Sequence, residues 1–249
     1  MTAATEPVLA EEADGVVTLR LNRPERGNAL GPEMVEALRD AFEGAVTSGA
    51  RLIVLRGEGK HFCTGFDLSD LEALSDGDLL LRFVCIEELL QRIHAAPVMT
   101  LAVATGRTFG AGADLFAACD RRIALQGSSF AFPGPGFGLV LGTGRLAALV
   151  GRDAARAILL GGAEMPAEDA LRAGLATAVL EAGAVEAEIA RAAAAAKRLD
   201  ARTVAALHRR TAQADDDADL AALVRSAARP GLKQRILDYR ASVARARTR

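Results

Sequence analysis

The sequence has few of the residues that build metal sites. It contains three cysteines and three histidines among 249 residues, and no two cysteines have the CxxC spacing. The cysteines are also far apart, at positions 63, 85 and 119. Structural zinc and related sites combine several cysteine and histidine ligands at short spacings. We therefore expect no metal site in this protein.

Long apolar runs and a large excess of charge are also absent. No apolar run approaches the ~18–20 residues that span a bilayer, and the N-terminal stretch MTAATEPVLAEEADG lacks the basic and apolar regions of a secretory signal. The formal net charge of −2 gives no indication of a nucleic-acid or anionic-membrane partner. These absences favour a cytoplasmic globular protein.

The residues that are present indicate an α/β fold. About half of them are apolar, 51%, which is enough for a large core. Segments of strand-like alternation or short apolar runs are followed by glycine turns and then by apolar residues at helical spacing. This order predicts strands at 15–22, 51–57, 98–106 and 121–125, and helices at 32–46 and 79–94. From about residue 144 onward we expect helices only, and a C-terminal tail that packs on a neighbour or is solvated.

The glycine-rich turns do not match nucleotide-binding motifs. GEGKH at 57–61 lacks the earlier glycine and the Ser or Thr after the lysine of a phosphate loop, and GRTFGAGAD at 106–114 has the wrong spacing for GxGxxG. Each turn nevertheless leads from a strand toward a helix, and the first amides of a helix have no partner within it. Two such turns facing one another would direct two N–H donors at one oxyanion. Tight packing is the simpler explanation of the glycines, and composition alone leaves both open.

Four motifs, in order, resemble the crotonase (enoyl-CoA hydratase/isomerase) superfamily. They are VVTLRLNRPERGNAL, RLIVLRGEGKHFCTGFDL, PVMTLAVATGRTFGAGADLFAACDRRIAL and ARAILLGGAEMPAEDALRAGLA. The resemblance implies an α/β spiral of ββα units (1–195) followed by a helical trimerisation region (196–249). It further implies an acyl-CoA substrate, no cofactor apart from the coenzyme A of that substrate, and a homotrimer or dimer of trimers.

The resemblance also assigns binding roles to the two glycine turns. The thioester oxygen would lie between the N–H of Phe66 and that of Ala111. Arg26 would meet a coenzyme A phosphate, although an ordinary solvated arginine fits the sequence equally well. The remaining positions that would bind the substrate are Glu25, Gly27, Thr64, Gly65, Asp67, Leu68, Gly112, Pro133 and Gly134.

The catalytic carboxylates of the family are only partly present. Hydratases use two glutamates, and the first corresponds here to Asp114, which is either an acid/base or a helix-capping aspartate. The second follows proline in a motif of the type F-x-x-P-E, and that position is Gly134 in FAFPG. No Asp, Glu, His, Tyr or Cys lies between residues 120 and 153 to replace it. Water addition by two carboxylates is therefore not expected.

A single acid/base suits double-bond isomerisation, which removes a proton beside the thioester and returns it elsewhere. We expect an acyl-CoA enzyme of the enoyl-CoA hydratase/isomerase type, with isomerisation favoured. A thioester hydrolase, a decarboxylase and an acyl-CoA-binding protein without catalysis remain alternatives. Phe130, Phe132 and Phe137 would form either an apolar acyl pocket or ordinary core.

Overall fold

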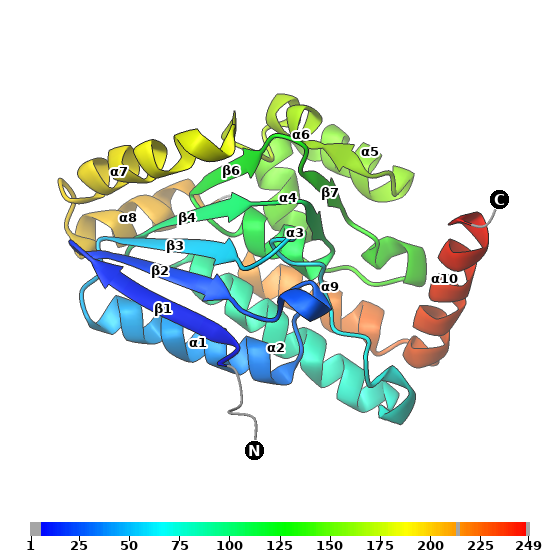
Figure 1. Cartoon of the computed structure of the whole chain (residues 1–249). Coiled ribbons are helices and arrows are strands. Elements are labelled where there is room, and N and C mark those ends of the chain that lie inside the picture. The colour runs from blue at the N-terminus through cyan, green and yellow to red at the C-terminus, as the bar shows by residue number, and fades with distance from the viewer. Residues whose placement is uncertain (1–5, 213–214, 248–249) are drawn as a thin grey trace, which may run out of the picture.

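A six-stranded sheet runs through the middle of the molecule in our computed structural model, which describes residues 6–212 and 215–247 (Figure 1). Its first two strands are antiparallel and every later neighbour is parallel. In spatial order the strands are β1 (Val8–Ala13), β2 (Val16–Leu21), β3 (Leu52–Gly57), β4 (Met99–Ala104), β6 (Arg121–Leu125) and β9 (Ala178–Leu180). The parallel strands are joined through helices, as βα connections require.

A second, smaller sheet lies beside the first and carries the glycine-rich segment of residues 130–138. Its strands are β5 (Arg107–Phe109), β7 (Ser129–Ala131) and β8 (Met165–Pro166), in the order β5-β7-β8. After β7 the chain turns directly into a short 3₁₀ helix, η3 (Gly134–Phe137). This small sheet therefore sets where the glycine-rich segment leaves the core.

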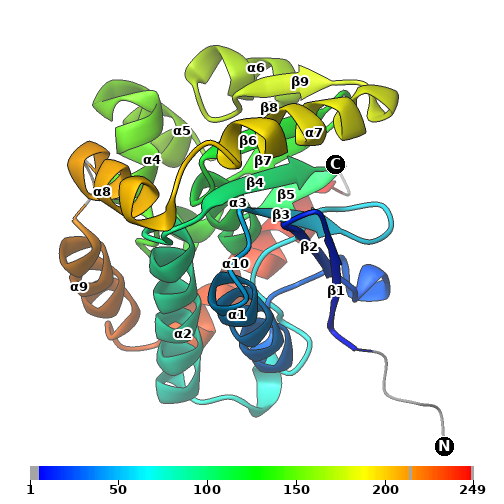
Figure 2. The ribbon, with the colours of Figure 1, turned by 90° about the vertical axis from the view of Figure 1, so that its left-hand side faces the viewer.

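Helices cover both faces of the large sheet (Figure 2). One face packs on α7 (Val185–Ala196), where Ile189 belongs to the same buried apolar cluster as Leu101 and Ile123. The opposite face packs on α1 (Pro32–Thr47), α2 (Asp76–His94) and α3 (Ala111–Ala117). Helix α2 begins where Ser75 and Asp78 form a reciprocal capping box, which satisfies its first amides.

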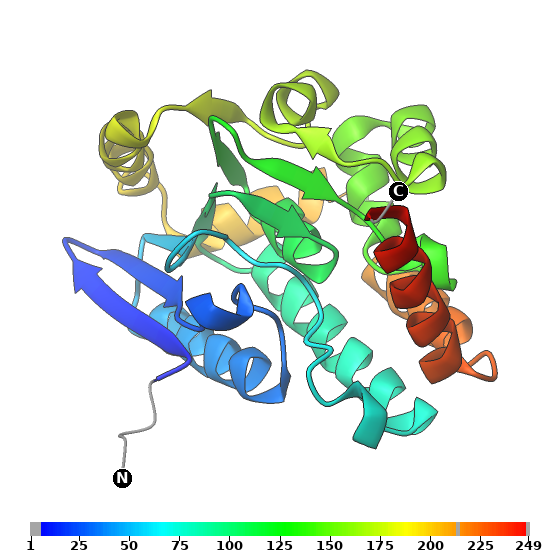
Figure 3. The same ribbon diagram turned by 45° about the vertical axis from the view of Figure 1, so that its right-hand side comes forward.

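The C-terminal helices pack on the same chain. Between the small sheet and β9 lie α4 (Thr143–Val150), α5 (Arg152–Gly161) and α6 (Ala167–Ala173), and after α7 come α8 (Ala201–Thr211), α9 (Asp216–Ala227) and α10 (Leu232–Arg247). Leu223 of α9 and Ile236 of α10 are buried against Leu79 and Phe83 of α2. Figure 3 shows α10 beside α9, on the side of the molecule away from β1.

The structure confirms the α/β class and the expected strands and helices to within a few residues. One expectation about the order of helices and strands is wrong, and one strand was not predicted. Residues beyond 144 are not helical throughout, because β8 and β9 each complete a sheet edge with two or three residues. Strand β1, which pairs with β2 at the opposite edge, was also not predicted. The domain boundary at 195/196, the oligomeric state and the cytoplasmic location stay predictions. None of the described helices is long and apolar enough to cross a membrane.

Candidate active site

The two glycine turns that resemble oxyanion-binding loops meet in space. Gly65 has φ +100°, and a Cβ placed on it would lie 2.7 Å from the carbonyl oxygen of Phe109 and 3.5 Å from the nitrogen of Ala111. A residue with a side chain would therefore be strained and would collide with backbone. Glycine at 65 lets the 64–68 loop lie against the start of α3.

Two backbone amides at this junction have no acceptor among the described residues. The backbone groups on either side of Phe66 are hydrogen-bonded: the N–H of Leu30 donates to the carbonyl of Gly65, and the N–H of Asp67 donates to the carbonyl of Leu30. The N–H of Phe66 takes no part in this pattern. The N–H of Ala111, the first residue of α3, is likewise unpaired. Both residues line the same cavity, so these donors are available to a ligand.

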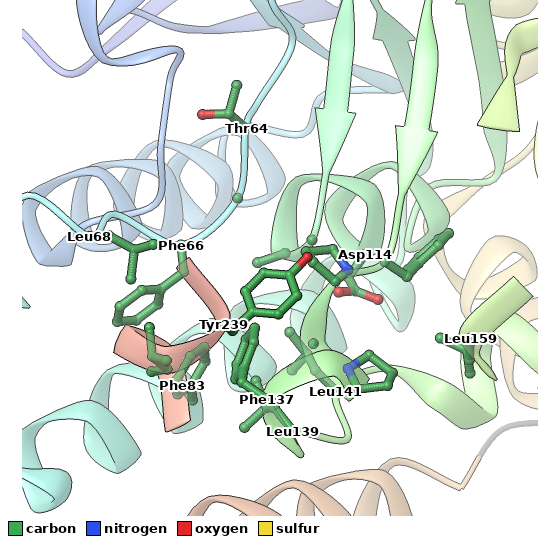
Figure 4. Close-up of a pocket in the computed structure, with 18 of the residues that line it drawn as sticks. Thr64, Phe66, Leu68, Phe83, Asp114, Phe137, Leu139, Leu141, Leu159 and Tyr239 are labelled. Carbon is green, nitrogen blue, oxygen red and sulfur yellow. The ribbon is translucent and has the colours of Figure 1, made fainter. Parts of the chain in front are cut away.

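The cavity encloses about 130 Å³ and has largely apolar walls (Figure 4). The ring of Phe66 stacks on Phe83 of α2, with centroids 4.3 Å apart and planes inclined by 24°. Other apolar walls come from segments far apart in the chain, namely Leu68, Phe132, Pro133, Pro135, Phe137, Leu139, Leu141, Leu159 and Ile236. Such a cavity suits an acyl chain better than a polar ligand.

Asp114 lies one helical turn after Ala111 and faces this cavity. The residue is 5% exposed, and its carboxyl group accepts no hydrogen bond from any described residue. It is therefore not a helix cap; the N-cap of α3 is Gly110, and no side chain caps that end. Burial raises the pKa of Asp114 well above the ordinary aspartate value; Arg145 opposes that rise, whereas Glu87 and Asp219 add to it.

A buried ion pair lies behind Asp114. Arg145 and Glu87 are 1% and 0% exposed and pair at 2.6 Å. A Cβ placed on Gly142 would lie 2.7 Å from Oδ1 of Asp114 and 3.4 Å from Nη2 of Arg145, so the carboxyl and guanidinium groups face the same glycine. Asp219 of α9 accepts the N–H groups of Gly144 and Arg145 at the start of α4. Asp114 thus belongs to a buried charged network in which it is the member facing the cavity.

The glycine-rich segment of residues 130–138 also lines the cavity. Gly134, where a hydratase would carry its second glutamate, lines the cavity at the start of η3. Phe132 and Phe137 line it as well. Phe130 does not: it is fully buried and packs on Phe116 with centroids 4.9 Å apart. Of the three phenylalanines, then, two form the pocket and one belongs to the core.

The segments expected to bind coenzyme A are in contact. The N–H of Thr64 donates to the carbonyl of Gly27 at 2.9 Å, and Nη1 of Arg26 donates to Ser69 at 3.1 Å and lies 3.6 Å from Asp67. Arg26 and Asp67 line a groove of about 550 Å³ that also contains Arg23 and Arg82.

Three of the predicted binding residues line neither this groove nor the cavity. Glu25 is exposed on the turn η1 (Pro24–Arg26). Gly27 packs against Thr64, and a Cβ on Gly112 would lie 2.3 Å from the carbonyl oxygen of Cys63. The two glycines therefore allow close packing of the loops that shape the site. A direct binding role for these three residues stays a prediction.

No sequence pattern indicated the residues that α2, α5 and α10 contribute to the cavity. These include Phe83, Leu159, Ile236, Tyr239 and Arg240. The α10 residues have the spacing of one helix face, but no local pattern shows which cavity that face covers. Within residues 6–212 and 215–247, no group of three Cys, His, Asp or Glu side chains is placed to hold a metal ion. The absence of a cofactor stays a prediction.

Comparison with known proteins identifies the family. The family model for enoyl-CoA hydratase/isomerase matches residues 11–229. The chain belongs to this family. Its membership of the crotonase superfamily, predicted from the four motifs, is thereby confirmed, and with it an enzyme of the enoyl-CoA hydratase/isomerase class.

Individual relatives agree with this assignment. The chain is 40% identical over 187 residues to the Mycobacterium tuberculosis protein named probable enoyl-CoA hydratase echA6, covering 72% of this chain and 74% of the relative. It is 34% identical over 213 residues to mouse enoyl-CoA hydratase domain-containing protein 3, mitochondrial, covering 83% and 71%. A crystal structure from Bordetella parapertussis, assigned as an enoyl-CoA hydratase/isomerase, superposes with a TM-score of 0.92 at 48% identity over 94% of this chain and 98% of that one.

Proposed function

We propose that this enzyme isomerises the double bond of enoyl-CoA thioesters through an enolate, with Asp114 as its single acid/base. The observation that carries the proposal is the convergence of two unpaired amides and one buried carboxyl group on a single apolar cavity. The N–H groups of Phe66 and Ala111 would hold the thioester oxygen. Preorganised donors of this kind stabilise an oxyanion without reorganising during the reaction.

The position of Asp114 supports a role in proton transfer. It lies three residues beyond Ala111 on α3, so a thioester held at Ala111 would place its adjacent carbons near the carboxyl group. Its raised pKa also fits, because a general base works best when its pKa lies near the working pH. Gly134 also lines the cavity, and among the described residues no second carboxyl group lines it to activate water.

The reaction balances with these groups alone. The Asp114 carboxylate removes a proton from C2 of a 3-enoyl-CoA, and the electron pair of that C–H bond delocalises into the thioester oxygen and the C3–C4 double bond. The proton, now on Asp114, is then delivered to C4. The double bond moves to C2–C3, and Asp114 returns to its ionised form. No water, metal or redox partner enters the overall reaction.

Coenzyme A would bind outside the cavity, in the groove that holds Arg26. The guanidinium groups of Arg23, Arg26 and Arg82 line this groove beside Asp67 and Asp70. Charge-assisted hydrogen bonds from arginine are well suited to phosphate groups. The 64–68 loop forms both the inner edge of the groove, at Asp67, and the wall of the cavity, at Phe66. A thioester could therefore follow this loop from one to the other.

Enzyme assays with 3-enoyl-CoA and crotonyl-CoA test the proposal. We expect 3-enoyl-CoA to gain the absorbance of a conjugated thioester, whereas crotonyl-CoA should lose little of it by hydration. Asp114→Asn should lower isomerisation ~10²–10⁴-fold, the usual contribution of a general acid/base. Asp153→Asn, at an exposed position in the first turn of α5, is the matched control and should leave the rate unchanged.

Three outcomes would contradict the proposal. If Asp114→Asn kept activity within a few-fold, another group would transfer the proton. Release of free coenzyme A or carbon dioxide in place of isomerisation would show a hydrolase or decarboxylase using the same amides. Tight binding of acyl-CoA without turnover at any chain length would favour a binding protein, the role that the missing carboxylate at Gly134 keeps open.

A further inference from the structure

The buried ion pair behind Asp114 leaves the Asp114 carboxyl group itself unpaired. Nη2 of Arg145 donates to Glu87 at 2.6 Å, and Nη1 lies 3.4 Å from the carboxylate of Asp216. No described residue donates a hydrogen bond to the carboxyl group of Asp114. The guanidinium group beside Asp114 is therefore held by other carboxylates.

Arg145 is nevertheless close enough to pair with Asp114. The position that a Cβ on Gly142 would occupy lies 2.7 Å from Oδ1 of Asp114 and 3.4 Å from Nη2 of Arg145. Gly142 has a left-handed φ of +55°, which favours glycine, so no side chain separates the two groups at this point. A carboxylate and a guanidinium attract one another more strongly inside a protein than in water. A change of rotamer at Arg145 would bring them into contact.

Glu87 holds the guanidinium group from a fixed position within α2. The Glu87 side chain is 0% exposed, and its second oxygen accepts Nε2 of Gln91, one turn later, at 3.0 Å. The same nitrogen of Gln91 donates to the backbone carbonyl of Asp216 at 2.9 Å. On the other side of the pair, Asp219 accepts the N–H of Arg145 at 3.2 Å and so fixes the start of α4. Both partners of the ion pair are therefore held by further hydrogen bonds.

The other titratable groups around Asp114 come from α2, α9 and α10. Burial, and after it the negative charges that include Asp219 of α9, raise the pKa of Asp114. Burial lowers the pKa of His94, at the end of α2, so this side chain adds no charge near neutral pH. From α10, Tyr239 and Arg240 line the cavity, and water screens the charge of the exposed Arg240. The ion pair thus contributes the buried charges most open to test by substitution.

Stability alone does not explain the ion pair. Taking two charges out of water costs free energy that their attraction offsets only in part, and apolar residues of similar size are often at least as stable. A chemical reason lies in the neighbouring carboxyl group. If Arg145 paired directly with Asp114, the ionised carboxylate would be stabilised and would accept a proton from carbon less readily.

We propose that Glu87 is a positioning residue for the reaction: by holding the guanidinium group of Arg145, it leaves the Asp114 carboxylate free to accept the substrate's proton. The inference rests on the proposed function for the role of Asp114. Neither Glu87 nor Arg145 lines the cavity, so both act through Asp114 and not on the substrate. Glu87 is needed only because Arg145 is present.

Titration of Asp114 in wild type and in Glu87→Gln tests the proposal. Infrared difference spectra follow the band of the protonated carboxyl group, which Asp114→Asn assigns by its loss. In Glu87→Gln the freed guanidinium group should turn to Asp114 and lower its titration midpoint by about one pH unit or more. The plateau of kcat/KM for isomerisation should fall roughly three- to tenfold, because a weaker base transfers the proton more slowly. KM should stay unchanged, since neither residue of the pair lines the cavity.

The double variant Glu87→Gln/Arg145→Gln removes the guanidinium group as well. Its titration midpoint should rise again, and its plateau rate should return to near the wild-type value. The two amides leave no unpaired charge in the core, so this variant also tests the proposal if Glu87→Gln alone does not fold. Glu88→Gln, at the neighbouring exposed position of α2, is the matched control and should change neither quantity.

A midpoint that is unshifted or raised in Glu87→Gln would overturn the inference, even if the rate fell. A folded double variant with a rate far below that of wild type would overturn it as well. The titration needs no turnover, so the two proposals fail separately. A lowered midpoint in an enzyme without isomerase activity would refute isomerisation and leave Glu87 as the residue that keeps Arg145 from Asp114. Isomerisation without that shift would refute only the role of Glu87.

Discussion

The two walls of the cavity are built in different ways. One wall, from the 64–68 loop and the start of α3, consists of backbone amides placed by Gly65 and by tight contacts between neighbouring loops. The other consists of side chains brought from η3, α5 and α10 onto the segment around Gly134. In our account, the first wall supplies the chemistry of the thioester and the second determines which acyl group fits. A change in the first wall should therefore lower the rate for every substrate, and a change in the second should alter selectivity.

The largest effect is expected from adding one methyl group to the first wall. Gly65→Ala combines a left-handed φ of +100° with a Cβ 2.7 Å from a carbonyl oxygen, so the loop must move away from α3. Displacing one of the two amides should lower turnover ~10²–10³-fold for all acyl chains. Gly127→Ala is the matched control, because Gly127 also has positive φ, +77°, but nothing lies within 4 Å of the added Cβ. Turnover of Gly65→Ala close to that of the control would refute this role of the loop.

The same contrast determines how much of the site could be predicted from the sequence. The elements of the first wall were predictable because they are local: strand, glycine turn and helix start follow one another within a few residues, as around Gly65 and Ala111. The roles of the Phe66 and Ala111 amides and of Asp114 came only from the resemblance to the family, and they stay predictions. The burial and charged neighbours that raise the pKa of Asp114 were not predictable, because Glu87 and Asp219 come from α2 and α9.

The second wall could not be predicted from local patterns. Tyr239 reaches the cavity only because α10 docks on Gly136, a contact across about a hundred positions of sequence that depends on tertiary packing. The edge strand β9 was not predicted, for a related reason. Its three residues pair with β6, and so short a segment has no periodicity of its own.

The second prediction concerns the pH dependence of the first wall. Only ionised Asp114 can accept the substrate's proton, and burial raises its pKa well above the ordinary aspartate value. We therefore expect kcat/KM for isomerisation to rise about tenfold per pH unit below that pKa and to level off above it. A rate that is already level at the ordinary aspartate pKa of ~4 would show that Asp114 is not the base.

The third prediction disturbs the second wall through its contact with α10. In Gly136→Ala the added methyl group collides with the Tyr239 ring, so α10 must shift. We expect a loss of about 1–3 kcal/mol in the free energy of unfolding, typical of overpacking, and a change in the preferred acyl group. Gly161→Ala, where nothing lies within 4 Å of the Cβ, should do neither. If Gly136→Ala kept the acyl-group preference of wild type, α10 would not determine which acyl group binds.

The smallest effect is expected away from both walls, where α8 attaches to the core. His208 of α8 lies 2.9 Å from Asp120, and this hydrogen-bonded partner raises the pKa of His208. The stabilisation is complete below the unfolded histidine pKa of ~6.5 and is lost as pH rises through the higher folded value. His208→Gln should therefore lower the free energy of unfolding by about 0.5–1 kcal/mol at pH 6 and by less at pH 9. Chemical denaturation at the two pH values measures this difference, and an equal loss at both would exclude the ion pair as its cause.

Hydrogen exchange at the carbon next to the thioester tests the central claim most directly, because it detects the enolate whatever product follows. Butyryl-CoA is incubated with the enzyme in D₂O, and the deuterium at C2 is measured by mass spectrometry. The account predicts exchange catalysed by wild type and reduced at least ~100-fold in Asp114→Asn and Gly65→Ala. Wild-type enzyme that binds butyryl-CoA but catalyses no exchange, or an Asp114→Asn variant that exchanges as fast as wild type, would contradict it.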